Sequence, residues 1–385
     1  MVVNEVTKGV ATLTPRAAYV HVPFCRHRCG YCNFSVVAGR DDLTQAFLDA
    51  LARELSELGT PREVDTLFIG GGTPTHLQPR ELVRLLETVQ YWFPTASGYE
   101  WSVESNPADL SREKTEILAT HGVTRISLGV QSFQDRKLGL LERDHRCHEV
   151  IQAFDLARRH VASVSIDLIF GVPGETLAEW ERDLRQAIAL KPDHLSTYSL
   201  TFERGTLFWN RRRKGDLRPL DEDIAGRLYE RCIDALEAAG WDHYEVSSFA
   251  LPGHRCRHNE VYWTGGEYFA AGPGAARFID GHREANHRST STYLRCLREG
   301  RNPVQESELL DAEMVARERL VFGLRRLEGV ALTRFQRDTG YSVQQLAGDA
   351  VTRFLDMRLL EKTETHLRLT RRGLLVSDSL WPDLI

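Results

Sequence analysis

The chain lacks three features that would place it in a membrane, outside the cell or on nucleic acid. Among its 385 residues no apolar run approaches the ~20 residues that span a bilayer. The amino-terminal stretch MVVNEVTKGVATLTPRAAYVHV has no basic start followed by an apolar block, so we see no secretory signal. A basic excess is also missing, because 49 Lys and Arg stand against 54 Asp and Glu. We therefore expect a cytoplasmic protein with no transmembrane segment that does not bind nucleic acid.

A complete set of cysteine pairs is missing as well. The count is seven, and an odd number in a large chain without a signal argues against a disulfide framework. Cys147, Cys232 and Cys296 are most simply small apolar core residues. Three others, Cys25, Cys29 and Cys32, lie within eight residues of one another, and this clustering requires a chemical explanation.

The first two-thirds of the chain alternates β-branched apolar runs with amphipathic helical patterns. Six β-α pairs in succession predict a parallel sheet. No GxGxxG opens the first unit, which weakens a dinucleotide-binding interpretation, so we expect an α/β fold with a partial (β/α)6 TIM-type barrel. The predicted strands are 17–24, 64–69, 99–104, 125–130, 163–170 and 194–200, and the predicted helices are 41–58, 80–92, 111–121, 146–160, 176–190 and 221–239.

The pattern changes after about residue 245, which predicts three parts. Residues 1–245 form the partial barrel, 246–308 a connecting segment rich in Gly, His and aromatics, and 309–385 a separate α+β module. In that module, helices at 309–325, 331–338 and 343–357 precede a strand pair around 359–370, an order typical of a winged helix. Because the chain has no basic excess, we expect this C-terminal module to pack against the barrel and not to bind DNA.

Unusual residues follow the predicted strands where each one ends. The cysteines follow the first strand, GGGTP at 70–74 follows the second, and Glu104 and Gln131 end the third and fourth. Asp167 lies within the fifth strand. Because the carboxyl ends of barrel strands meet at one mouth, we expect these residues to converge there.

The three clustered cysteines have two interpretations. Thiolates suit an iron–sulfur cluster or zinc, and structural zinc takes four protein ligands. No further cysteine is near, although His21 and His27 could compete as ligands, whereas a cubane cluster on three cysteines leaves one iron open to a small chelating molecule. A second zinc candidate is the H-x-C-x-H pattern that ends at His258.

These motifs in this order resemble a known family. CxxxCxxC with Tyr31 before its last cysteine, then GGGTP, then VESNP, is similar to the radical S-adenosylmethionine superfamily. YxHxPFC from Tyr19, GVQSF at 129–133, DLIFGVP at 167–173 and HNEVYW at 258–263 resemble the oxygen-independent coproporphyrinogen III oxidase-like group and, within it, the haem-chaperone (HemW) family. The resemblance runs from about Tyr19 to near the C-terminus.

The resemblance implies a set of cofactors and the residues that hold them. A 4Fe–4S cluster would be bound by Cys25, Cys29 and Cys32, and its open iron chelated by S-adenosylmethionine, with Gly71 and Gly72 beside the methionyl amine. The HNxxYW segment would bind haem through His258, Tyr262 and Trp263. No catalytic side chain is assigned. The positions matching those around S-adenosylmethionine are Tyr19, Tyr31, Gly71, Gly72, Thr73, Glu104, Gln131, Arg143 and Asp167.

The function implied is a haem chaperone that delivers haem to acceptor proteins and receives electrons from a donor such as flavodoxin or ferredoxin. Cleavage of S-adenosylmethionine is expected. The alternatives are the oxidative decarboxylation of coproporphyrinogen III, a related methyltransferase, and a zinc-stabilised interaction protein. Phe34 stands where the oxidase has a fourth cysteine, which argues against the first. The chain also departs from the family pattern at Ala276, where a His is usual, and at Arg204, where a Pro is usual.

Overall fold

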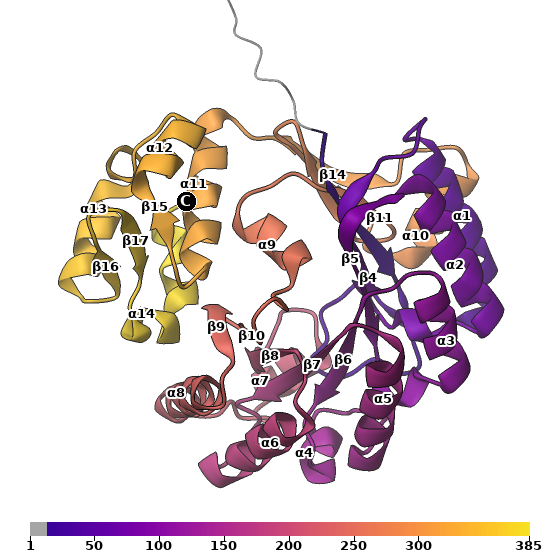
Figure 1. The fold of residues 1–385 in the computed structure, drawn as a ribbon, viewed down its shortest axis with the longest axis horizontal. Coiled ribbons are helices and arrows are strands. Elements are labelled where there is room, and N and C mark those ends of the chain that lie inside the picture. The colour runs from indigo at the N-terminus through magenta and orange to yellow at the C-terminus, as the bar shows by residue number, and fades with distance from the viewer. Residues whose placement is uncertain (1–13) are drawn as a thin grey trace, which may run out of the picture.

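The computed structural model describes residues 14–385, and most of the stretch we searched for a secretory signal lies outside them. A nine-stranded sheet in the order β11-β1-β4-β5-β6-β7-β8-β10-β9 curves around the molecule (Figure 1). Its central six strands are mutually parallel, which confirms the predicted α/β partial barrel. They are β1 (Ala17–Val22), β4 (Val64–Gly71), β5 (Thr95–Ser105), β6 (Arg125–Gln131), β7 (Ser163–Phe170) and β8 (His194–Ser199).

Helices cover the outer face of this sheet (Figure 1). Each buries one apolar stripe; Leu51, Leu85 and Trp180 are fully buried between helix and sheet. Local signals fix the helix starts: Pro79 occupies the first turn of α2, and Thr176 forms a capping box before α6. The helices are α1 (Thr44–Ser56), α2 (Pro79–Trp92), α3 (Arg112–Thr120), α4 (Asp135–Leu140), α5 (Cys147–His160), α6 (Leu177–Leu190) and α8 (Glu222–Ala238).

The sheet does not close into a full barrel, and a short helix lies between its two edges. The edges are β11 (Phe269–Ala271) and β9 (Asp242–Glu245), with β10 (Ser248–Ala250) beside β9. Between them lies α9 (Arg257–Trp263), near the centre of Figure 1. The Glu100 carboxylate on β5 accepts hydrogen bonds from two backbone N–H groups of the first turn of α9, each at 3.1 Å. This anchor within the barrel holds a helix too short to be stable alone.

Several elements of the middle region were not predicted from the sequence. The helix α7 (Leu207–Lys214) follows β8, and α10 (Thr290–Arg298) packs against α1. A small parallel pair, β2 and β3, flanks the cysteine loop, and a three-stranded antiparallel sheet follows β11. Their bounds are β2 (Phe24–Cys25), β3 (Val37–Ala38), β12 (Ala276–Ile279), β13 (His282–Asn286) and β14 (Val304–Leu309).

The C-terminal module has the predicted winged-helix order of three helices and a small sheet, and it packs against the barrel. Leu327 N–H donates to the Tyr244 carbonyl at 3.1 Å, and Arg371 pairs with Asp234 on α8. Apolar packing continues from the barrel into the module, so the boundaries at 245 and 308 stay predictions. Among helices in residues 14–385, none is long and apolar enough to cross a bilayer. The module comprises α11 (Ala312–Arg325), β15 (Val330–Ala331), α12 (Leu332–Thr339), α13 (Val343–Asp356), β16 (Leu360–Lys362), β17 (His366–Leu369) and α14 (Arg371–Leu375).

Candidate functional site

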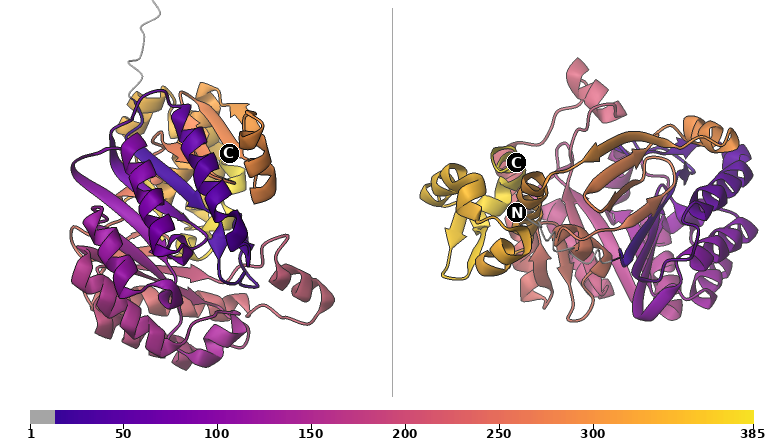
Figure 2. Two further views of the ribbon diagram at one scale, coloured as in Figure 1. Left: turned by 90° about the vertical axis from the view of Figure 1, so that its right-hand side faces the viewer. Right: turned by 90° about the horizontal axis from the view of Figure 1, so that it is seen from above.

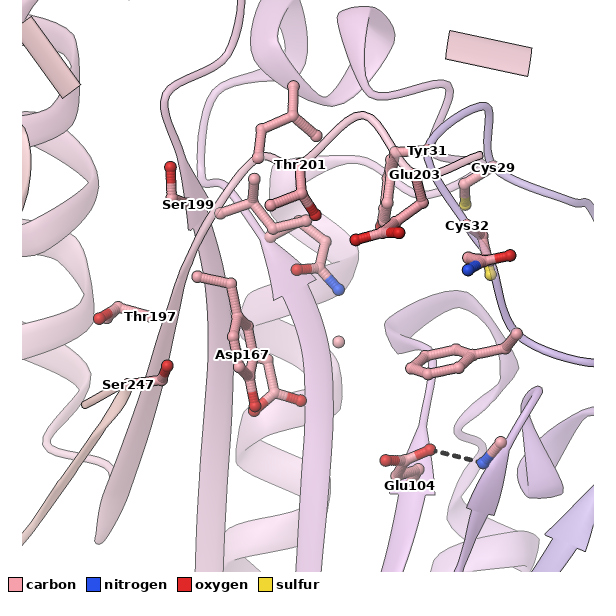
Figure 3. Close-up of a pocket in the computed structure, with 18 of the residues that line it drawn as sticks. Cys29, Tyr31, Cys32, Glu104, Asp167, Thr197, Ser199, Thr201, Glu203 and Ser247 are labelled. Atoms are coloured by element: carbon pink, nitrogen blue, oxygen red, sulfur yellow. Dashed lines mark hydrogen bonds between the residues drawn. The ribbon is translucent and has the colours of Figure 1, made fainter. Parts of the chain in front are cut away.

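A cavity of about 1760 Å³ opens at the carboxyl ends of the parallel strands and reaches the C-terminal module. Most of the side chains singled out in the sequence line it, and Figure 3 shows several of them around the opening. Pockets of roughly 300–1,000 Å³ hold one drug-sized ligand, so this cavity has room for more than one. Those lining it include Tyr19, Cys25, Cys29, Tyr31, Cys32, Gly71, Gly72, Thr73, Glu104, Gln131, Arg143, Asp167 and Tyr262.

The three clustered cysteines lie on one loop, residues 25–36, which we call the cluster loop. Pairing of β2 with β3 closes the loop, and Cys32 N–H donates to the Cys29 carbonyl at 3.1 Å in a tight turn. All three cysteines are free thiols and line the cavity. One loop therefore presents three soft donors to the same space.

The surroundings of these thiols fit an iron–sulfur cluster. Burial raises the pKa of Cys25 to about 12 and also raises the pKa of Cys32, so a bound cation is needed to hold them as thiolates at neutral pH. The Nη1 atom of Arg143 lies 3.4 Å from the Cys29 sulfur and can balance excess negative charge. In residues 14–385 no three His, Cys, Asp or Glu side chains converge as on a single metal ion. Three thiols beside a half-buried guanidinium match the donor set of a cluster.

The H-x-C-x-H pattern does not assemble into a zinc site, because its three side chains contact different partners. His254 Nδ1 lies 3.3 Å from Ser163 Oγ, and Cys256 Sγ lies 3.8 Å from a Glu100 oxygen. The third member, His258, is turned toward β4, as described below.

Gly71 and Gly72, at the end of β4, are required because their backbone lies very close to other atoms of the protein. Gly71 has a φ of 104°, and a Cβ there would lie 2.3 Å from the His21 ring. A Cβ on Gly72 would lie 2.6 Å from the Phe24 carbonyl oxygen. The missing side chains thus let β4 approach the end of β1, a reason that the sequence pattern did not reveal. Both glycines also border the cavity.

Two acidic side chains of the parallel strands border the cavity. Glu104 on β5 accepts a hydrogen bond from Gly71 N–H at 2.9 Å, drawn as a dashed line in Figure 3. Burial raises the pKa of Glu104 to about 7 and also raises the pKa of Asp167 on β7. Ser127 Oγ donates to Asp167 at 3.2 Å. The pair can accept hydrogen bonds from an ammonium group or ribose hydroxyls.

A polar network links Arg143 to the strand ends through Asn106 and Asp144, two residues that the sequence motifs did not single out. The Nη2 group of Arg143 donates to the Gly129 carbonyl at 2.8 Å and to Asn106 Oδ1 at 3.2 Å. Asn106 Nδ2 donates to Asp144 at 2.8 Å. Asn106 directly follows the end of β5, and its place after a predicted strand could have signalled its position at the mouth.

The loop after β6 is held by a buried charged group. Gln131 has a φ of 64°, a strained conformation for a residue other than glycine. The next residue, Ser132, donates from Oγ to Asp183 on α6 at 2.8 Å, and Lys137 Nζ lies 3.1 Å from the same carboxylate. Lys137 also pairs with Glu175 in the loop after β7. The sequence held no signal for this group, because its members are far apart along the chain.

The HNxxYW segment forms α9 and divides its side chains between two places. His258 is 1% exposed; its Nδ1 lies 3.0 Å from Thr66 Oγ1 and its Nε2 lies 2.8 Å from the Tyr262 hydroxyl. Burial lowers the pKa of His258 to about 3. Trp263 lines a second cavity of about 280 Å³ between α9 and α11, with the Arg325 guanidinium 4.5 Å from its ring centre. Within the HNxxYW segment Tyr262 borders both cavities, and Tyr268, which follows the segment, does so too.

Two family models and several known proteins match this chain over most of its length. The model of the radical SAM superfamily matches residues 19–187, and the model of the HemN C-terminal domain matches residues 310–376. The heme chaperone HemW of Bacillus subtilis is 34% identical over 372 residues, covering 95% of this chain and 98% of that protein. The chain belongs to the HemW family. It is also 30% identical to radical S-adenosyl methionine domain-containing protein 1 of Danio rerio, covering 95% of this chain and 86% of that protein.

One solved structure shares the whole architecture. The coproporphyrinogen III oxidase HemN of Escherichia coli, described as a radical SAM enzyme, superposes with a TM-score of 0.83 at 22% identity, covering 96% of this chain and 90% of that chain. This likeness confirms the fold. Ala276, where the family usually has a His, lies at the start of β12 and borders the main cavity.

Proposed function

We propose that this protein is a cytoplasmic haem chaperone that binds a 4Fe–4S cluster, S-adenosylmethionine and haem and passes haem to acceptor proteins. The observation that carries the proposal is the family membership over nearly the whole chain, together with three free thiols on one loop of a cavity large enough for several ligands. Phe34, 63% exposed where the oxidase pattern has a cysteine, supports the chaperone over the oxidase.

The cluster loop would bind the iron–sulfur cluster, and the strand ends would bind S-adenosylmethionine. Cys25, Cys29 and Cys32 would hold the cluster, and Arg143 would balance its charge. Glu104 and Asp167 would bind the polar groups of S-adenosylmethionine along the strand ends. A cluster bound there supplies one-electron transfer to the sulfonium of S-adenosylmethionine.

Haem would bind through α9, where His258 is the iron ligand of choice and Tyr262 and Trp263 offer apolar area. His258 has both ring nitrogens engaged within the protein, so α9 must release it before iron can bind. Tyr262, which borders both cavities, is the residue whose hydroxyl must leave first.

The decisive experiment is anaerobic reconstitution of the cluster, followed by haem titration with and without S-adenosylmethionine. We expect a saturable Soret change and transfer of the bound haem to apomyoglobin. His254→Ala, a half-exposed neighbour in the same segment, is the matched control for His258→Ala. An unaltered Soret spectrum and stoichiometry in His258→Ala would remove His258 from the proposal.

The same preparation tests the alternative activity. Robust anaerobic conversion of coproporphyrinogen III to protoporphyrinogen IX by the pure protein would replace the chaperone proposal with the oxidase. We expect no such turnover, because the position of the oxidase's fourth cysteine is Phe34.

A further inference from the structure

The helix α7 stands out from the barrel as a positively charged arm. Figure 2 shows it in rose, projecting from the body of the molecule in both views. It carries four consecutive basic residues, 211–214. The segment 201–220 contains six basic and two acidic residues, whereas the whole chain has a net charge of −5. The arm is therefore positively charged on a chain that is negatively charged overall.

The base of this arm is built on the cluster loop. Phe208 N–H donates to the Gly30 carbonyl at 2.9 Å, and the Phe208 ring centre lies 6.2 Å from that of Tyr31. A Cβ on Gly30 would lie 2.3 Å from the Phe208 ring, so the contact is close. Gly30 lies between Cys29 and Cys32, and α7 is therefore attached directly beside the proposed cluster ligands.

The charges of the arm are available for a partner. Arg212, Arg213 and Lys214 are exposed and form no ion pair among residues 14–385. Arg211, in contrast, pairs with Glu142 at 3.0 Å and fixes the helix to the barrel. The cluster loop carries a further exposed arginine, Arg28, two residues before the Gly30 carbonyl to which α7 is attached.

We propose that α7, together with Arg28, is the docking surface of an acidic one-electron carrier protein. Complementary charge attracts such a partner and orients it during encounter. The carrier loses one electron and the cluster held by the loop gains it, with no bond made or broken. The inference rests on the proposed function only in requiring that cluster.

An anionic membrane fits the arm less well. The four basic residues are consecutive, so they surround the second half of the helix and interrupt any apolar stripe along it. In the first half Phe208 is buried and Leu207 alone among the large apolar side chains of α7 is exposed. The guanidinium of Arg212 lies 5.6 Å from the ring centre of Phe202 and 5.9 Å from that of Trp209, so it covers the aromatic surface nearby. A charged protein surface suits this arrangement better than an acyl layer.

The test compares two triple variants of the reconstituted protein. R212Q/R213Q/K214Q removes the arm's free charges, and R159Q/R295Q/R298Q removes three exposed arginines of α5 and α10 as the matched control. Binding of oxidised flavodoxin and of a plant-type ferredoxin is measured by calorimetry at low salt and at about 0.15 M salt. We expect the arm variant to bind about tenfold more weakly at low salt, with the difference shrinking as salt rises.

Rates of cluster reduction by flavodoxin hydroquinone, followed by electron paramagnetic resonance, should fall in parallel, while iron content stays unchanged. Equal losses in both triple variants, or no binding of either carrier to the unaltered protein, would overturn the docking surface. Loss of binding to vesicles of anionic lipid without loss of carrier binding would overturn it in favour of a membrane. Haem titration of the arm variant reports separately on the proposed function, because the three substituted residues line neither of the cavities that α9 borders.

Discussion

The cluster loop and α9 hold their key side chains in opposite states. In the loop, three thiols face the large cavity and the backbone turn already presents them together. In α9, His258 is buried, and both ring nitrogens have partners in Thr66 and Tyr262. The first region is organised for a ligand before the ligand arrives, whereas the second must give up existing interactions.

The difference has an energetic meaning. Each hydrogen bond that His258 surrenders costs about 0.5–1.5 kcal/mol, and a hydroxyl left buried without a partner adds about 1–3 kcal/mol. A histidine in this state binds haem iron only when the free energy of haem binding exceeds the cost of breaking these hydrogen bonds. We therefore expect cluster assembly to depend on the thiols alone and haem binding to depend on a conformational equilibrium of α9.

The largest effect should come from removing a thiol. Cys29→Ala should abolish the brown ~400 nm absorption of an iron–sulfur cluster, because a three-thiol site has no ligand to spare. Thermal unfolding should change little, since Cys29 lies at the cavity surface. The control variant Cys147→Ala, changed at the first residue of α5, should still bind the iron–sulfur cluster. Four irons in a triple variant of Cys25, Cys29 and Cys32 would contradict the assignment.

Removing the buried histidine should instead reduce stability. His258→Ala leaves a cavity and unpairs the hydroxyls of Thr66 and Tyr262, so the free energy of unfolding should fall by about 2–4 kcal/mol. Denaturant unfolding monitored by circular dichroism measures it, with His254→Ala as the milder control. A change below that of the control would mean that α9 is not held by His258 and would remove the contrast between the two regions.

An intermediate effect is expected at the strand ends. Glu104→Ala should weaken S-adenosylmethionine binding by about 1.5–3 kcal/mol, the usual scale for a hydrogen bond to a charged group. Calorimetry on the reconstituted protein measures the affinity, with Glu104→Gln retaining the shape of the side chain. Unchanged affinity in both variants would place Glu104 outside the binding site.

Glu104 should also leave a signature in the pH dependence of stability. Its pKa is about 7 in the folded protein against 4.5 for an ordinary glutamate, so the folded state holds the proton more tightly than the unfolded chain. The stability contributed by this group is therefore present at low pH and lost as the pH rises from about 4.5 to about 7. Glu104→Gln should flatten the unfolding free energy over that window, and an unchanged slope would contradict burial of the acid.

The smallest effect should come from Tyr262→Phe, which frees His258 Nε2 without removing the aromatic ring. The unfolding free energy should fall by about 1 kcal/mol, the loss of one hydrogen bond. Haem should bind faster in stopped-flow measurements, because the hydroxyl no longer has to leave. Slower binding would show that the hydroxyl assists haem and does not block it.

The sequence predicted the parallel strands and their helices well, and the reason is local. β7 was placed at its observed residues, because its apolar run is continuous and is flanked by helix signals. Both α7 and α9 were missed, since tertiary contacts fix them: the Gly30 carbonyl holds α7, and Glu100 holds α9. Periodicity cannot detect helices that depend on partners more than a hundred residues away.

The residues of the site also separate into those that local sequence places and those that only tertiary contacts place. Residues at strand ends were grouped correctly at one cavity, because strand direction alone places them there. Whether His258 faces that cavity depended on α9, whose position the sequence did not reveal. The Lys137 group escaped notice because Glu175 and Asp183 are recognisable as its partners only in space.

The position of α9 between the two edges of the sheet has a thermodynamic consequence. The chain passes from β9 through β10 and α9 to β11, so this helix joins the edges covalently as well as lying between them. If a molecule that moves α9 also moves the strands joined to it, the shape of the mouth changes as well. By linkage, whatever factor haem imposes on the affinity for S-adenosylmethionine, S-adenosylmethionine imposes on the affinity for haem. Movement of α9 within the gap in the sheet would then couple the binding free energies of the two ligands without direct contact between them.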